Sequence, residues 1–310
     1  DVRLTMDAEF TVLASQLLAN HAGAAVVMDA DSGEILAMAS QPGFDLGSMD
    51  EDWESLASAV DSPLVNRAAQ LLYPPGTALG PFLLAAAQAA GLSVELPAET
   101  SFTLDDQRFD CVRQPADVKD WDRLVAAACP GALARLGVAL GGERLLALFA
   151  DLGFYSTPDL PLDLHAQSMP ASLERPEISA IGQDGLGVSP VQMAAAACAL
   201  GNSGMRPQAR IVLEIEQAGG DWQAAEGAEA HKVLGGAFST SALPGLAYEP
   251  LDIWEVTGRA LGKQGQIYTW YLAGSLPERL GDGRCVVVLL ESSTRVLAQS
   301  IGRQLLTNNN

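Results

Sequence analysis

Residues 23–45 read GAAVVMDADSGEILAMASQPGFD, and this stretch decides how the chain folds. Two apolar runs, Ala24–Met28 and Glu34–Ala39, flank the polar residues Asp29–Gly33. That intervening segment ends in glycine, as the turn of a β-hairpin requires. We therefore expect two antiparallel strands here. Residues 7–20, just before them, carry apolar side chains near helical spacing and predict a helix.

The pattern changes twice beyond this hairpin. A long Ala- and Leu-rich region favours helices at 79–91, 121–140, 142–152 and 189–201. Strand patterns return at 253–261, 266–273 and 285–290, and an amphipathic stretch at 294–306 predicts a last helix. This order predicts a single α+β domain over residues 1–310. One antiparallel sheet, built from both chain ends (about 1–50 and 235–310) and flanked by helices, would lie beside an all-α lobe (about 51–234).

Composition excludes several functional classes. The chain has 310 residues, 48% of them hydrophobic and 18% charged, which favours a large folded core. Its net charge of −20 argues against nucleic-acid binding, because phosphate contacts need clustered Lys and Arg. No apolar run is long enough for a transmembrane helix. We expect the acidic stretch at 49–54, MDEDWE, to be a solvated surface loop rather than a metal site.

Motifs for metal and cofactor chemistry are missing from the sequence. There is no Walker A loop, no dinucleotide-binding glycine pattern, and no His or Cys pair at metal-ligand spacing. We therefore expect no cofactor and no metal site. Only three residues are lysines, Lys119, Lys232 and Lys263, so a reaction that needs a catalytic lysine must use one of them. Cys198 and Cys285 lie in apolar runs and should be buried thiols.

Four segments together resemble the transpeptidase domain of penicillin-binding proteins, especially those of class B. They are LTMDAEF (4–10) with the 23–45 hairpin, PLVNRAAQLLYPPGTALGPF (63–82), AIGQDGLGVSPVQMAAAACALGNSGMRP (180–207) and TWYLAGSLP (269–277). The second is similar to the family's NRA…YPPGS approach to its nucleophile, and the third to its IGQG…TPxQ helix. The resemblance spans almost the whole chain and implies the β-lactamase/transpeptidase-like fold.

The resemblance also implies where the catalytic motifs should stand. In the family, the serine of S-x-x-K attacks a D-Ala-D-Ala carbonyl or a β-lactam, and the lysine one turn later takes its proton. Here Thr77 stands at the serine position and Gly80 at the lysine position. In the second motif, S-x-N, the serine and asparagine positions hold Ala128 and Pro130. We expect Thr77 to act as the N-cap of helix 78–91.

The third motif, K-T-G, lies on a strand that pairs with substrate in the family, and it can be placed in two registers. Val256-Thr257-Gly258 keeps the threonine and glycine and leaves a more usual loop to the next strand. Lys263-Gln264-Gly265 keeps the lysine and glycine. We favour the first register, in which Lys263 is a solvated hairpin residue. Either way the motif is incomplete.

Together, the resemblance and the missing motif residues predict a catalytically inactive transpeptidase-like domain. General-base assistance alone is worth roughly 10²–10⁴ in rate. Removing one member of a set of catalytic groups that act together can cost about as much rate as removing the whole set. We expect a scaffold or regulator of peptidoglycan synthesis or cell division whose partners are proteins of those machineries. The alternative is an active or β-lactam-sensing D-Ala-D-Ala transpeptidase or carboxypeptidase with Thr77 as an atypical nucleophile, and then a peptidoglycan stem peptide is the ligand.

The family also implies a cellular setting. The domain should lie outside the cytoplasmic membrane, held by an anchor that precedes it in the full-length protein and is absent from this chain. Cys111 and Cys129 stand where the family often carries cysteines, and an extracytoplasmic setting permits a disulfide. We predict that these two cysteines are bonded to each other.

Overall fold

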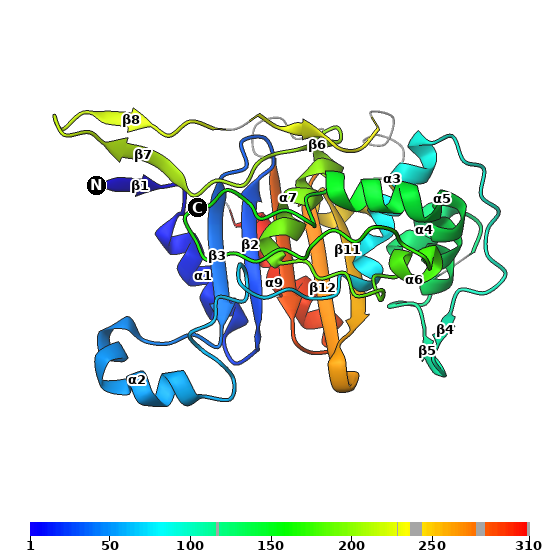
Figure 1. Cartoon of the computed structure of the whole chain (residues 1–310), viewed down its shortest axis with the longest axis horizontal. Coiled ribbons are helices and arrows are strands. Elements are labelled where there is room, and N and C mark those ends of the chain that lie inside the picture. The colour runs from blue at the N-terminus through cyan, green and yellow to red at the C-terminus, as the bar shows by residue number, and fades with distance from the viewer. Residues whose placement is uncertain (116–117, 228, 236–243, 277–282, 309–310) are drawn as a thin grey trace.

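A six-stranded antiparallel sheet forms the centre of the fold, in the order β10-β11-β12-β13-β2-β3 (Figure 1). The computed structural model describes residues 1–115, 118–227, 229–235, 244–276 and 283–308. The strands of this sheet are β2 (Gly23–Asp29), β3 (Ile35–Gln41), β10 (Ala247–Tyr248), β11 (Ile253–Leu261), β12 (Ile267–Ser275) and β13 (Arg284–Leu290). β13 pairs with β2, so the sheet is assembled from both chain ends as predicted.

The two faces of the sheet bury alternate side chains, as the period of two in a strand requires. On one face, Ala25 and Val27 of β2 pack under α1 (Ala8–Leu18) and α9 (Arg295–Thr307). On the other, Val26 and Met28 join the large core shared with the helical lobe. Burial on both faces explains why β2 reads as a continuous apolar run. The α+β class and the terminal helices agree with the sequence analysis.

The helical lobe differs from the prediction in the number of its helices and in where they begin and end. Its elements are η2 (Gly76–Leu79), α3 (Gly80–Ala89), α4 (Trp121–Ala126), α5 (Pro130–Asp151), α6 (Pro176–Ala180) and α7 (Pro190–Gly201). The single helix expected at 121–140 is two helices, because Ala128 has a left-handed backbone (φ 51°) and Pro130 has no N–H with which to continue a helix. Within α5, Gly141 (φ 76°) interrupts the helical backbone where a boundary was expected.

The region expected to be mainly helical also contains strands that the prediction missed. Two of them, Val212–Glu216 (β7) and Trp222–Ala224 (β8), form a small sheet with Val2–Leu4 (β1) of the N-terminal part, in the order β1-β7-β8. Two short pairs are β4 (Phe102–Leu104) with β5 (Gln107–Phe109), and β6 (Met205–Arg206) with β9 (His231–Lys232). In β7, Leu213 and Ile215 alternate with Glu214 and Glu216, which is the period-two signal of a strand.

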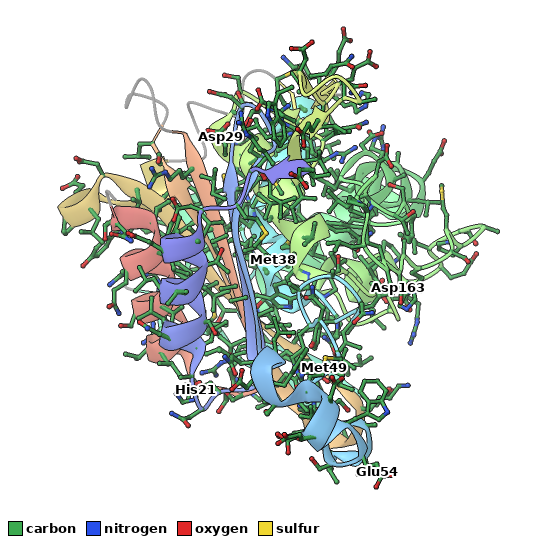
Figure 2. The ribbon with its side chains drawn as sticks, turned by 90° about the vertical axis from the view of Figure 1, so that its left-hand side faces the viewer. His21, Asp29, Met38, Met49, Glu54 and Asp163 are labelled. Carbon is green, nitrogen blue, oxygen red and sulfur yellow. A yellow bond between two sulfur atoms is a disulfide. The ribbon has the colours of Figure 1, made fainter. Side chains whose placement is uncertain are left out.

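The acidic stretch at 49–54 is a helix, not the loop that we expected. η1 (Leu46–Ser48) leads into α2 (Met49–Ser58), whose first turn carries Asp50, Glu51 and Asp52. Carboxylates at that end interact favourably with the helix dipole, which accounts for a helix in so polar a sequence. α2 stands away from the sheet in both views, with Met49 and Glu54 labelled in Figure 2.

The remaining short elements are the 3-10 turns η3 (Pro244–Leu246), η4 (Glu249–Leu251) and η5 (Lys263–Gly265). Pro277, the last residue of the fourth family-like segment, lies outside the described residues. Within the described ranges, no helix combines the length and apolar character needed to cross a bilayer.

Candidate active site

Thr77 is held against β11 rather than at the end of a helix. The backbone N–H of Arg259 donates to Thr77 Oγ1 at 2.9 Å, and that hydroxyl lies 3.4 Å from the Arg259 carbonyl. Thr77 is only 5% exposed. The N-cap prediction was wrong: η2 runs directly into α3, the position before α3 is Leu79, and no side chain caps either element. The hydroxyl is already engaged by the strand.

β11 accepts this contact because most of its outer edge has no strand partner among the described residues. β10 pairs only with Ile253 and Trp254, so the Arg259 N–H lies on an open stretch of edge. Two glycines let η2 approach backbone to backbone. A Cβ on Gly258 would lie 2.2 Å from the Ala78 nitrogen, and one on Gly76 (φ +57°) would lie 2.1 Å from the Arg259 carbonyl oxygen. The Thr77 hydroxyl thus accepts the hydrogen bond that the Arg259 N–H would otherwise donate to a neighbouring strand.

Gly80, which we predicted at the position of the family's lysine, has apolar neighbours. Gly80 is buried at the start of α3. A Cβ there would already lie 3.1 Å from Val125 Cγ1 and 3.5 Å from Leu133 Cδ1. A side chain at this position would therefore require the Val125 side chain of α4 to shift by a few tenths of an ångström.

The residues that we predicted at the second motif lie at the turn between α4 and α5. Ala128 and Pro130 are both buried, and neither carries a polar side-chain atom. Cys129 between them is bonded to Cys111, with a Cα–Cα distance of 4.0 Å, so the structure contains the disulfide that we expected. This bond ties the segment at 111 to the start of α5. Cys198 and Cys285 are buried free thiols, as predicted, and burial raises the pKa of Cys198 well above its usual range.

The two candidate registers of the third motif lie in different places. Val256, Thr257 and Gly258 are on β11, and Gly258 faces Ala78. Thr257 Oγ1 accepts a hydrogen bond of 3.2 Å from Gln299 Nε2 of α9. Lys263-Gln264-Gly265 forms η5, the turn beyond the end of β11.

Arginines that sequence reasoning missed surround this part of β11. Arg113 Nε donates to the Ala126 carbonyl at 3.2 Å. Burial, and then the neighbouring Arg295, lower the pKa of Arg259. The Arg259 Nε atom is buried with no hydrogen-bond partner among the described residues. Arg259 directly follows a Thr-Gly pair, and this position in the sequence could have pointed to it as a site residue. Its proximity to Arg295 of α9 could not be predicted, because it is a tertiary contact.

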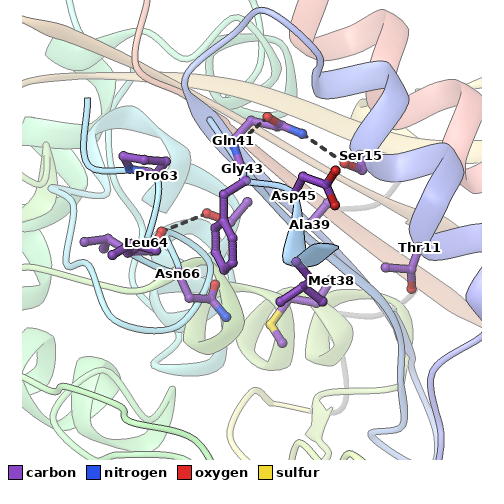
Figure 3. Close-up of a pocket in the computed structure, with 14 residues that line it drawn as sticks. Thr11, Ser15, Met38, Ala39, Gln41, Gly43, Asp45, Pro63, Leu64 and Asn66 are labelled. Atoms are coloured by element: carbon purple, nitrogen blue, oxygen red, sulfur yellow. Dashed lines mark hydrogen bonds between the residues drawn. The ribbon is translucent and has the colours of Figure 1, made fainter. Parts of the chain in front are cut away.

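Open space beside the motif segment of β11 is very small. A cavity of about 10 Å³ lies between Arg113, Thr257, Arg295 and Gln299, which is no more than the room for one water molecule. A pocket of about 670 Å³ lies past the end of β11, where Lys263 joins Tyr73, Tyr268 and Glu291. Another, of about 660 Å³, lies at the β3 edge of the sheet (Figure 3).

The family model described as "Penicillin binding protein transpeptidase domain" matches residues 23–274. The chain belongs to this family. The match runs from the first residue of β2 to Gly274, one residue before the end of β12, so it takes in Thr77, the α4–α5 turn and β11 in one alignment.

Curated relatives and solved structures are similar to this penicillin-binding-protein domain to different extents. Peptidoglycan D,D-transpeptidase PbpA of Mycolicibacterium smegmatis is 28% identical over 208 residues, covering 60% of this chain and 42% of that protein. Peptidoglycan D,D-transpeptidase MrdA of Acinetobacter baumannii is 43% identical over 86 residues, covering 26% and 13%. In both cases the matched region is less than half of the relative's length.

Structural similarity extends over nearly the whole chain. The crystal structure of PBPA from Mycobacterium tuberculosis superposes with a TM-score of 0.86 at 21% identity, covering 98% of this chain and 80% of that one. The D,D-transpeptidase domain of a peptidoglycan glycosyltransferase from Eggerthella lenta gives 0.83 at 22% identity, covering 98% and 81%. At such identities the likeness establishes the shared fold.

Proposed function

We propose that this transpeptidase-family domain has lost acyl-transfer chemistry and serves as a scaffold or regulator in peptidoglycan synthesis or cell division. One observation carries the proposal. Thr77, at the predicted nucleophile position, is 5% exposed, and its hydroxyl accepts a hydrogen bond from the backbone N–H of Arg259.

The chemistry of acyl transfer explains why this matters. A hydroxyl attacks a carbonyl only when a positioned base takes its proton, and this is typically worth roughly 10²–10⁴ in rate. The residue one turn after Thr77 is Gly80, packed against Val125 and Leu133. An attacking Thr77 would also have to leave its bond to Arg259 and reach a carbonyl from a buried position.

The second and third motifs support the same proposal. Ala128 and Pro130 have no group that could pass a proton. We assign the third motif to Val256-Thr257-Gly258, because Gly258 is the glycine that contacts η2. In this register the lysine position is the buried, apolar Val256.

Labelling with a reporter penicillin tests the proposal. Solved relatives include M. tuberculosis penicillin-binding protein A as its penicillin G acyl-enzyme complex, so that protein is a suitable positive control. Intact mass spectrometry should find no adduct on this chain under conditions that fully label the control. An adduct that maps to Thr77 would instead support the alternative of an active or β-lactam-sensing enzyme.

A second candidate function is non-covalent recognition of a peptidoglycan stem peptide. The partnerless Arg259 Nε and the nearby Arg113 and Arg295 favour it, because guanidinium groups bind carboxylates. It predicts a higher Tm with a D-Ala-D-Ala peptide than with its C-terminal amide, and loss of that difference in Arg295→Gln. Equal Tm values with both peptides would reject it. The cavity of about 10 Å³ beside these groups weighs against it.

We further propose that the domain acts outside the cytoplasmic membrane, anchored in the full-length protein. Disulfides persist in oxidising compartments, and this chain carries the Cys111–Cys129 bond. The matched relatives are named as peptidoglycan D,D-transpeptidases, which makes proteins of cell-wall synthesis the natural partners. Protease protection of the tagged full-length protein in intact cells against lysed cells tests the location.

A further inference from the structure

A strongly acidic segment connects β3 to the buried Arg67. Between Pro42 and Asn66 the chain has no basic residue and six acidic ones: Asp45, Asp50, Glu51, Asp52, Glu54 and Asp61. No ion pair joins any of these carboxylates to the described part of the chain. We call residues 44–60 of this segment, which include η1 and α2, the acidic arm.

The acidic arm also exposes large apolar side chains. No residue of α2 is buried. Leu46 is 77% exposed, Trp53 51% and Phe44 37%, while Val60 is fully open to solvent. A lone exposed apolar residue is ordinary, but four on one short segment that buries nothing form an uncovered surface.

A groove lies beside the arm and is part of the same surface. It has a volume of about 660 Å³ and runs between the end of β3, the α1 residues Thr11 and Ser15, and the segment Pro63–Asn66 (Figure 3). Phe44 and Leu46 of the arm form part of its wall, so a molecule in the groove would also contact the arm.

Hydrogen bonds hold the walls of this groove in place. Gln41 Nε2 donates to Ser15 Oγ at 2.9 Å, and the Gly43 N–H donates back to Gln41 Oε1 at 2.9 Å. On the opposite wall, Ser40 Oγ donates to the Val65 carbonyl at 3.1 Å. The groove is thus preformed on the sheet, which lowers the entropic cost of binding.

We propose that the acidic arm and this groove together form a docking surface for a basic amphipathic segment of a partner protein. Apolar side chains of that segment would enter the groove and cover Leu46 and Trp53, while its Lys and Arg side chains would face the carboxylates of α2. The charge of the arm decides between occupants, because its five carboxylates, none of which has an ion-pair partner among the described residues, repel nucleic acid, anionic lipid and a second copy of this acidic chain.

This inference rests on the proposed scaffold role, but its test does not involve Thr77 chemistry. The probe is a labelled amphipathic helical peptide of about 14 residues with Leu at i, i+3, i+4 and i+7 and Lys or Arg elsewhere. Fluorescence anisotropy measures its Kd for the whole chain at low and high salt. An otherwise identical peptide with Glu in place of Lys and Arg serves as the charge control.

Three variants separate the local surface from general charge attraction. The first replaces Asp50, Glu51, Asp52 and Glu54 by Asn or Gln, which removes charge without placing cations at the start of α2. The second makes the matched replacements at exposed acids elsewhere, Glu99, Glu143, Asp221 and Glu226. The third is Leu46→Ser with Trp53→Ser. Unchanged thermal unfolding shows that each variant folds.

We expect the first and third variants to bind the basic peptide at least about tenfold more weakly, while the matched variant changes Kd less than about threefold. Absence of binding to the unaltered chain, or equal losses in the first two variants, would overturn the proposal. A Trp53-dependent dimer in sedimentation, or Trp53-dependent binding to phosphatidylserine vesicles, would also overturn it, by assigning the surface to another occupant. Acylation of the chain by penicillin would contradict the proposed function, but it would not affect the proposal of a docking surface.

Discussion

The backbone N–H of Arg259 and the hydroxyl of Thr77 join β11 to η2 through a hydrogen bond of 2.9 Å. The bond lies on a stretch of strand edge that β10 does not cover. Thr77, which we predicted at the nucleophile position, therefore has a structural role that the sequence did not suggest, since a threonine before a helix is typical of an N-cap.

Thr77→Val tests this role directly. Valine has nearly the same shape as threonine, but it leaves the Arg259 N–H without its partner. We expect a loss of about 1–3 kcal/mol in the free energy of unfolding, measured by urea denaturation. Thr77→Ser keeps the hydroxyl and should lose clearly less. Equal stability of the valine variant and the unaltered chain would contradict the structural role.

Gly80→Lys should destabilise the fold and not activate it. The new side chain would start 3.1 Å from Val125 Cγ1, so that side chain would have to shift. Overpacking of this kind costs about 1–3 kcal/mol, and we expect a loss of stability in that range. Gly219→Lys is the matched control, because a Cβ at Gly219 meets nothing within 4 Å. Similar stability of the two variants would show that the Gly80 site has room for a lysine.

Reducing the Cys111–Cys129 bond should loosen the α4–α5 turn. The bond closes a loop with a sequence separation of 18, for which the chain-entropy relation gives about 3 kcal/mol. Dithiothreitol should lower the Tm of the unaltered chain and leave that of the double variant Cys111→Ala/Cys129→Ala unchanged. Equal Tm values with and without reductant for the unaltered chain would argue that the bond adds nothing to stability.

Alkaline pH should destabilise the protein through its buried tyrosines. Burial, and after it the carboxylate of Glu291, raises the pKa of Tyr73 well above the ordinary 10.0. Burial and the carboxylate of Glu255 do the same to the pKa of Tyr271. Burial also raises the pKa of Tyr155, to about 12. Above about pH 10 the unfolded chain releases protons that the folded chain keeps, so stability falls as pH rises, by up to about 1.4 kcal/mol per pH unit for each such tyrosine.

Two optical measurements check this pH dependence. Tyrosinate absorbance should report Tyr73 and Tyr271 only when circular dichroism reports unfolding. Ionisation of all five tyrosines in the folded protein below pH 11 would be inconsistent with the burial of these two phenols.

Much of the fold followed from local pattern. The 23–45 hairpin, the apolar strands of the C-terminal part and both terminal helices could be predicted, because period-two and helical spacing persist over whole elements. The break between α4 and α5 was missed, although Pro130 was a visible signal. α2 was also missed, since its stability depends on carboxylates near a helix terminus rather than on an apolar face.

The sequence predicted which residues stand at the motif positions, but it could not predict their surroundings. The family resemblance gave the positions of Thr77, Gly80 and Ala128. It could not give the Thr77–Arg259 hydrogen bond or the packing of Val125 against Gly80, because both join segments that are far apart in the chain. The arginines around β11 and the unpaired carboxylates of the acidic arm likewise depend on tertiary placement.

The most direct measurement is the intact mass of the chain after exposure to a reporter penicillin, alongside Thr77→Val and the M. tuberculosis penicillin-binding protein A control. A chain without a usable nucleophile or base should keep its unmodified mass, and Thr77→Val should be indistinguishable from it, while the control gains one acyl group. A stoichiometric adduct on the unaltered chain that disappears in Thr77→Val would contradict the account and identify an active acyl-transfer site.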